Sequence, residues 1–119
     1  MDPEIQVKRI YDEPSDGDGI RILVDRLWPR GVSKEKARID LWPKELTPSN
    51  DLRKWFHADP TRHAEFVVRY TAELDAQGQE VKELIESIEQ PLITLVTATK
   101  DIEKGHVAVL SAFIKAQFN

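Results

Sequence analysis

Polar side chains follow directly on an apolar segment in the first third of the chain. The segment Arg21–Gly31 reads "RILVDRLWPRG", so a strand-like run delivers a carboxylate (Asp25), two guanidiniums (Arg26 and Arg30) and an indole (Trp28) within six residues. Guanidinium groups bind carboxylates and phosphates through paired hydrogen bonds. This combination predicts one wall of a polar pocket for an anion.

A second polar turn follows the apolar segment Leu92–Val96, which has no exposed alternate positions and is typical of a strand covered on both faces. That turn, Thr97–Asp101, leads into a closing helix whose first N–H groups favour an anion. If Ile20–Val24 and Leu92–Val96 run parallel, both polar turns open on the same edge of a sheet, where ligands usually bind. We therefore expect the two turns to share one pocket.

The candidate site follows from this geometry. The catalytic candidates are Asp25 and His106, and the ligand-binding candidates are Arg26, Trp28, Arg30, Lys100 and Asp101. In any reaction, Asp25 would be the base or nucleophile, His106 would take the opposite acid or base role, and the cations would stabilise negative charge. A structural role stays open for each: Asp25 as a turn cap, Trp28 as a core anchor, or Lys100 and Asp101 as a surface pair.

Length and composition bound the class of protein. The 119 residues, 40% apolar and 32% charged, predict a single soluble domain over residues 1–119. The absence of cysteine excludes disulfides and thiol catalysis, and no nucleotide, hydrolase or metalloprotease motif is present, so we expect no cofactor and no metal. Without an apolar signal sequence or a membrane-length apolar run, the expected location is the cytoplasm.

Charge is unevenly placed along the chain. Residues 21–62 hold 10 Lys/Arg and 6 Asp/Glu, whereas the whole chain has a net charge of −4. An acidic protein with a basic middle is a poor general nucleic-acid coat, because nonspecific affinity comes from phosphate neutralisation. A small anionic ligand fits better, since local positive charge attracts it. Pairing of these cations with neighbouring acids is the structural alternative.

Local patterns predict an α/β fold with a short mixed sheet, helices on both faces and a single compact domain. The segments Ile5–Tyr11 and Ile20–Val24, joined by the loop Asp12–Gly19, are expected to form an antiparallel pair. Ser33, Ser49 and the pair Asp59-Pro60 are expected to start helices. The later helices carry apolar residues at helical spacing, which predicts one buried side for each. We interpret His63 as a packing residue on such a side, and the role of His57 stays open.

The same residues carry a family likeness. "VDRLWPRG", "WPKELTPSNDLRKWF", "EFVVRYTAEL" and "LVTATKDIEKGHVAVLSAFI" together resemble the YeaO-like branch of the domain of unknown function 488, from about Ile5 to Ile114. The resemblance implies a small cytoplasmic bacterial α/β protein without an established biochemical activity. Some relatives carry a transcription-regulator label, but no helix-turn-helix with a basic recognition helix is visible here.

Departures from the family pattern limit what is carried over. Relatives often have Tyr-Ala-Ala-Lys-Asp where this chain has Thr97–Asp101, and an asparagine commonly stands at the position of Gly105. The larger branch tends to show Cys-His-Arg where this chain has Gly105-His106-Val107. The resemblance therefore implies a role for His106 but no cysteine-dependent chemistry.

Three hypotheses remain at this stage, and none fixes the oligomeric state or decides whether the protein is an enzyme. The first is a pocket for an anionic small molecule, such as a nucleotide or sugar phosphate, with hydrolase or transferase chemistry left open. The second is a non-enzymatic module that contacts protein or nucleic acid through the Trp/Arg-rich residues 26–62, including Trp42 and Trp55. The third is a divalent-metal site on Asp25, Asp101 and His106.

Overall fold

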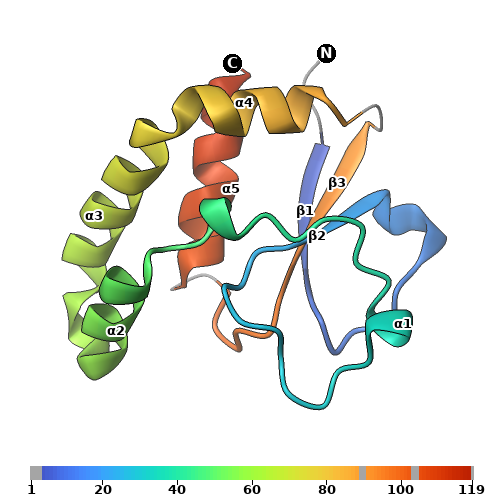
Figure 1. Ribbon diagram of the computed structural model, residues 1–119, viewed down its shortest axis with the longest axis horizontal. Coiled ribbons are helices and arrows are strands. Elements are labelled where there is room, and N and C mark those ends of the chain that lie inside the picture. Colours follow the sequence, from blue (N-terminus) through green and yellow to red (C-terminus); the bar gives the residue numbers. More distant parts are fainter. Residues whose placement is uncertain (1–3, 89–90, 103–104, 119) are drawn as a thin grey trace.

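Three parallel strands form the centre of the computed structural model, which describes residues 4–88, 91–102 and 105–118 (Figure 1). They are β1 (Glu4–Arg9), β2 (Ile20–Leu23) and β3 (Leu92–Thr97), in the order β1-β3-β2. Ile5 and Ile20 both stand opposite Ile93, on either side of β3. The strand that the sequence marks as covered on both faces therefore occupies the central position.

The predicted antiparallel pairing of Ile5–Tyr11 with Ile20–Val24 is wrong, and the described sheet is parallel instead of mixed. The connection between β1 and β2 crosses β3, because β3 lies between these two strands in the sheet. Thr94 Oγ1, on β3, donates to the carbonyl oxygen of Asp18 in this connection at 2.6 Å. The Asp18 carboxylate is buried there between Lys8 (3.0 Å) and Arg21 (2.7 Å). Because its charges are paired, this polar segment can lie buried over the sheet. The length of the loop alone does not indicate such a crossing.

The helices begin largely where the sequence predicts. They are α1 (Lys34–Ala37), α2 (Asn50–Ala58), α3 (His63–Ala76), α4 (Gly78–Glu86) and α5 (His106–Gln117), with 3₁₀ turns η1 (Asp16–Asp18), η2 (Lys44–Leu46) and η3 (Pro60–Arg62). Ser33 and Ser49 accept hydrogen bonds from the first turns of α1 and α2, which confirms both predicted caps. Asp59 caps η3, which runs into α3.

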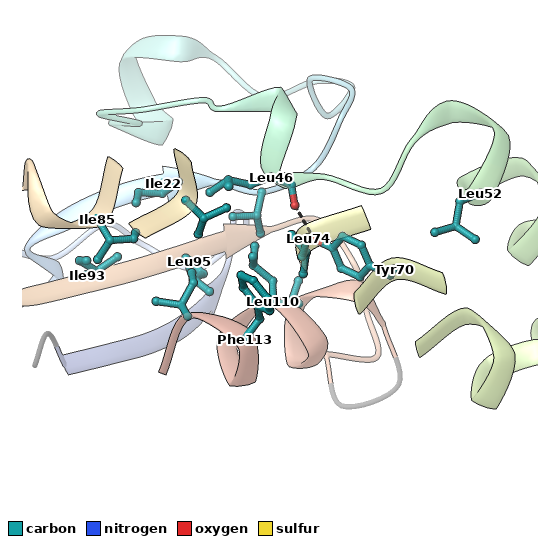
Figure 2. Packing of buried hydrophobic residues seen from close by; sticks show 14 of the residues in the cluster. Ile22, Leu46, Leu52, Tyr70, Leu74, Ile85, Ile93, Leu95, Leu110 and Phe113 are labelled. Carbon is teal, nitrogen blue, oxygen red and sulfur yellow. Dashed lines mark hydrogen bonds between the residues drawn. The ribbon is translucent and has the colours of Figure 1, made fainter. Parts of the chain in front are cut away.

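The two faces of the sheet bury different hydrophobic clusters. On one face, residues of α3, α4 and α5 pack in one cluster with strand residues such as Ile22 and Leu95. Figure 2 shows this cluster, with the Tyr70 hydroxyl donating to the carbonyl oxygen of Leu46. On the other face, Leu23 and Val96 pack with the short helix α1 and the chain around it. The predicted α/β class, with helices on both faces, is confirmed.

Within the described ranges, no helix combines the length and the apolar character needed to cross a membrane.

Candidate functional site

The ends of β2 and β3 lie side by side, as the sequence predicts. Val24, directly after β2, donates its N–H to the carbonyl oxygen of Val96 at 3.0 Å, so the next residues of both strands emerge at one edge. There Thr97 Oγ1 donates to Asp25 Oδ1 at 2.6 Å, and the Ala98 N–H donates to Oδ2 at 2.8 Å. The Asp25 carboxylate thus joins the two polar turns.

His106, the first residue of α5, approaches the same carboxylate. Its Nε2 lies 2.8 Å from the carbonyl oxygen of Val24 and 3.2 Å from Asp25 Oδ1. Both neighbours are hydrogen-bond acceptors, so Nε2 carries a hydrogen. The side chains of Asp25 and His106 are each 16% exposed. The two predicted catalytic residues therefore meet, in contact with the ends of both strands.

The hydrogen bonds decide the protonation of Asp25. Burial of the carboxylate acts to raise its pKa, but hydrogen bonds from His106, Thr97 and Ala98 outweigh burial, and the pKa lies below its ordinary value. Asp25 is therefore a carboxylate at neutral pH. Since a carboxylate with a lowered pKa and donors on both oxygens holds protons weakly, it is a poor general base.

A cavity of about 360 Å³ lies beside this pair. Its volume is within the range of small-molecule sites. The wall combines the end of β2, helix α2, the turn after β3 and the start of α5. The lining residues are Asp25, Arg26, Leu27, Pro48, Arg53, Phe56, His57, Phe66, Ala98, Thr99, Gly105 and His106.

Two arginines line the cavity from different elements. Arg26 donates from Nε to the carbonyl oxygen of Pro48 at 3.0 Å, which fixes its guanidinium in the wall. Arg53, on α2, has a buried Nε for which the described residues provide no hydrogen-bond partner. Sequence reasoning missed Arg53, although it stands three residues before Phe56 and so on the same side of the helix. That spacing was the available signal.

A second cavity, of about 450 Å³, adjoins the first. The two share four lining residues: Phe56, His57, Thr99 and Gly105. Asp101 and His63 line only the second cavity. His57, whose role the sequence left open, thus stands at the junction of the two cavities.

Three of the predicted ligand-binding residues lie elsewhere. The Trp28 indole donates to the carbonyl oxygen of Val32 at 2.8 Å and packs edge-on against Trp42, with ring centres 5.5 Å apart, in the cluster on the opposite face of the sheet. Arg30 and Lys100 are exposed and line neither of the two cavities. Of the predicted set, the first cavity brings together Asp25, Arg26 and His106, and the second adds Asp101.

The third hypothesis requires Asp25, Asp101 and His106 to meet around a metal ion. Among residues 4–88, 91–102 and 105–118, no three His, Cys, Asp or Glu side chains are grouped closely enough to hold one. The described geometry therefore gives the metal hypothesis no support.

Comparison with known proteins agrees with the family likeness in the sequence. The family model described as "Inactive DUF488-N3 subclade" matches residues 4–119. The uncharacterised protein YeaO of Escherichia coli K12 is 43% identical over 112 residues, which cover 94% of this chain and 97% of YeaO. An uncharacterised protein of Mycobacterium tuberculosis is 37% identical over 113 residues, 95% of each chain. No solved structure matches significantly. The chain therefore belongs to the YeaO-like family of DUF488 proteins.

Proposed function

We propose that this protein binds an anionic small molecule, of the nucleotide or sugar-phosphate type, in the cavity at the ends of β2 and β3, and that it does not turn this ligand over. The observation that carries the proposal is that two arginines, Arg26 and Arg53, line that cavity, and that the buried Arg53 Nε has no partner in the described chain. A buried unpaired donor costs roughly 1–3 kcal/mol. Rotation of the Arg53 guanidinium toward an anion in the cavity would remove that cost.

The charges around the cavity support the same ligand class. Arg26 and Arg53 contribute two permanent positive charges from two different elements. The carboxylate of Asp25 has donors on both oxygens, which compensate part of its negative charge. A bound anion would therefore experience a net attraction from the two guanidinium groups.

Binding without turnover is supported by the state of Asp25. Its lowered pKa makes it a weak base, and its oxygens are engaged by Thr97, Ala98 and His106, so it fits a positioning role toward His106 better than a nucleophilic one. The matching family model is described as an inactive subclade, in agreement with this reading. The expected cytoplasmic location belongs to the same proposal.

The alternative, an interaction module built on residues 26–62, has less support because its aromatic surfaces have partners within the chain. The Trp42 indole donates to the carbonyl oxygen of Asp25 at 2.7 Å. Arg62 and Arg69 lie over the Trp55 ring, at 5.0 and 4.2 Å from its centre. Interface anchors need aromatic surface that is available to a partner.

The proposal is tested by calorimetric titration with pyrophosphate, glucose 6-phosphate and adenosine 5′-monophosphate. We expect at least one of these anions to bind the wild type, and Arg53→Met to weaken that binding about tenfold or more, because a charge-assisted hydrogen bond contributes roughly 1.5–3 kcal/mol. The matched control is Lys54→Met, which removes the same charge from an exposed neighbouring position on α2 and lines neither cavity. It should bind within about twofold of the wild type. Absence of binding by all three anions, or equal effects of the two variants, would overturn the proposal.

A further inference from the structure

The aromatic side chain Phe56 is held rigidly at the junction of the two cavities. Its ring stacks on that of Phe66, with centres 4.2 Å apart and planes 14° from parallel. Phe66 is itself buried and contacts Tyr70, at 5.7 Å between ring centres. Phe56 remains only half-buried and lines both cavities. The molecule thus presents a fixed apolar ring surface to whatever occupies them.

Small residues also line the junction of the two cavities. Thr99 and Gly105, from the connection between β3 and α5, line both cavities together with Phe56 and His57 from α2. A Cβ atom on Gly105 would come within 3.2 Å of both the Asp101 carbonyl oxygen and Thr99 Cγ2. The chain around Gly105 is therefore closely packed. A cavity lined by an aromatic ring favours a ligand with a flat group that can pack against that ring.

The anion-binding side chain and the ring surface belong to the same helix. Arg53 and Phe56 are three residues apart on α2, and side chains at that spacing are neighbours, with Cβ atoms roughly 5–6 Å apart. A single small ligand can therefore contact both. The remaining wall of the first cavity includes the apolar side chains of Leu27 and Pro48, which suit a ligand that is not charged throughout.

We infer that the ligand of this site is an aryl or heteroaryl anion, in which a planar ring packs against Phe56 while Arg26 and Arg53 bind its charged group. This inference rests on the proposed function and narrows it, because a sugar phosphate has the charge but lacks the planar ring. Nucleoside monophosphates and simple aryl phosphates share the required chemistry. Ring–aromatic stacking in nucleotide-binding sites contributes roughly 1–3 kcal/mol per base.

The test compares phosphates that differ only in the attached group. Phenyl phosphate and cyclohexyl phosphate have the same charge and similar size, but only the first is flat, and adenosine 5′-monophosphate is paired in the same way with ribose 5-phosphate. We expect the ring-bearing member of at least one pair to bind the full-length protein about tenfold more tightly by calorimetry. Adenosine 5′-monophosphate alone showing this gain would identify a nucleotide as the source, and phenyl phosphate alone an aryl phosphate.

Two variants assign the gain to Phe56. Phe56→Leu should bring each ring-bearing phosphate to the affinity that its ringless partner has for the same variant, whereas Phe56→Tyr should keep the gain. Equal affinities within both pairs for the wild type would overturn the inference and leave anion binding intact, and this comparison does not depend on the folding of any variant. A gain that persists in folded Phe56→Leu would also overturn it. Failure of all four phosphates to bind would overturn this inference, and it would overturn the proposed function as well if pyrophosphate and glucose 6-phosphate also fail to bind.

Discussion

Replacement of Asp25 by asparagine should destabilise the protein by an amount that depends on pH. The carboxylate accepts from Thr97 Oγ1, from the Ala98 N–H and from His106 Nε2, and its side chain is 16% exposed. An asparagine has the same shape but only one acceptor oxygen. Its amide NH₂ must therefore face at least one of these three donors, and the charge assistance is lost from all of them.

The magnitude follows from the hydrogen bonds. A hydrogen bond to a charged group contributes roughly 1.5–3 kcal/mol, and a buried donor without a partner costs roughly 1–3 kcal/mol. The residual exposure of Asp25 lets water recover part of the loss, so we expect Asp25→Asn to lower the free energy of unfolding by about 3 kcal/mol at pH 7. For a domain of this size, such a change lowers Tm by about 10 °C.

The pH dependence has a definite sign. Because the pKa of Asp25 lies below the ordinary aspartate value of 3.8, its contribution is fully present above that value and is lost as the pH falls through the folded-state pKa. The stability difference between wild type and Asp25→Asn should therefore be present at pH 7 and at pH 5 and should narrow below about pH 4. Urea unfolding, followed by tryptophan fluorescence at pH 7, 5 and 3, measures this difference.

A matched substitution separates this effect from general loss of negative charge. Asp75 is exposed near the end of α3, and Asp75→Asn should change the free energy of unfolding by less than about 0.5 kcal/mol. Equal stability of Asp25→Asn and Asp75→Asn at pH 7 would refute the stabilising role of the Asp25 hydrogen bonds. A stability deficit of Asp25→Asn that stays the same down to pH 3 would refute it equally.

Two further substitutions test the crossing of the sheet by the β1–β2 connection. Gly19 has φ 64°, and a Cβ there would lie 2.1 Å from the carbonyl oxygen of Leu92. Gly19→Ala should therefore lower the free energy of unfolding, measured in urea, by about 3 kcal/mol or more. Gly17→Ala, where a Cβ would make only ordinary contact, should change it little. Asp18→Asn weakens the buried pair with Arg21 and should cost about 3–5 kcal/mol in the same assay, so near-wild-type stability would contradict the buried pairing.

The helix starts could be predicted because their chemistry is local. Ser33, Ser49 and Asp59 each accept from a backbone N–H two or three residues away, an interaction that the local sequence indicates directly. The order of the strands could not be predicted in this way. It involves contacts between distant residues, such as the hydrogen bond between Thr94 and Asp18, which are 76 residues apart, and a buried charged pair that would ordinarily be assigned to the surface.

Sheet geometry predicted the positions of the candidate residues better than proximity along the chain did. The rule that parallel strands end at a common edge predicted that the two polar turns meet, and Asp25 and His106 are in contact there. Trp28 is only three residues beyond Asp25, but the chain turns there, and its indole packs on the other face of the sheet with Trp42. By residue type alone, Arg53 looks like any solvent-exposed cation on a helix. Its spacing of three residues from Phe56 places it on the side of α2 that lines the cavity.

A carboxylate beside an anion-binding cavity would ordinarily repel the ligand, and the geometry around Asp25 explains why it need not. Asp25 follows β2, its partners Thr97 and Ala98 lie at the end of β3, and His106 begins α5, so one charged group connects three of the segments that line this cavity. The donors that hold these elements together also direct positive partial charge at the carboxylate, which reduces its field in the cavity. Removal of that carboxylate would therefore not simply improve anion binding, because the same change releases the imidazole and the backbone that shape the site.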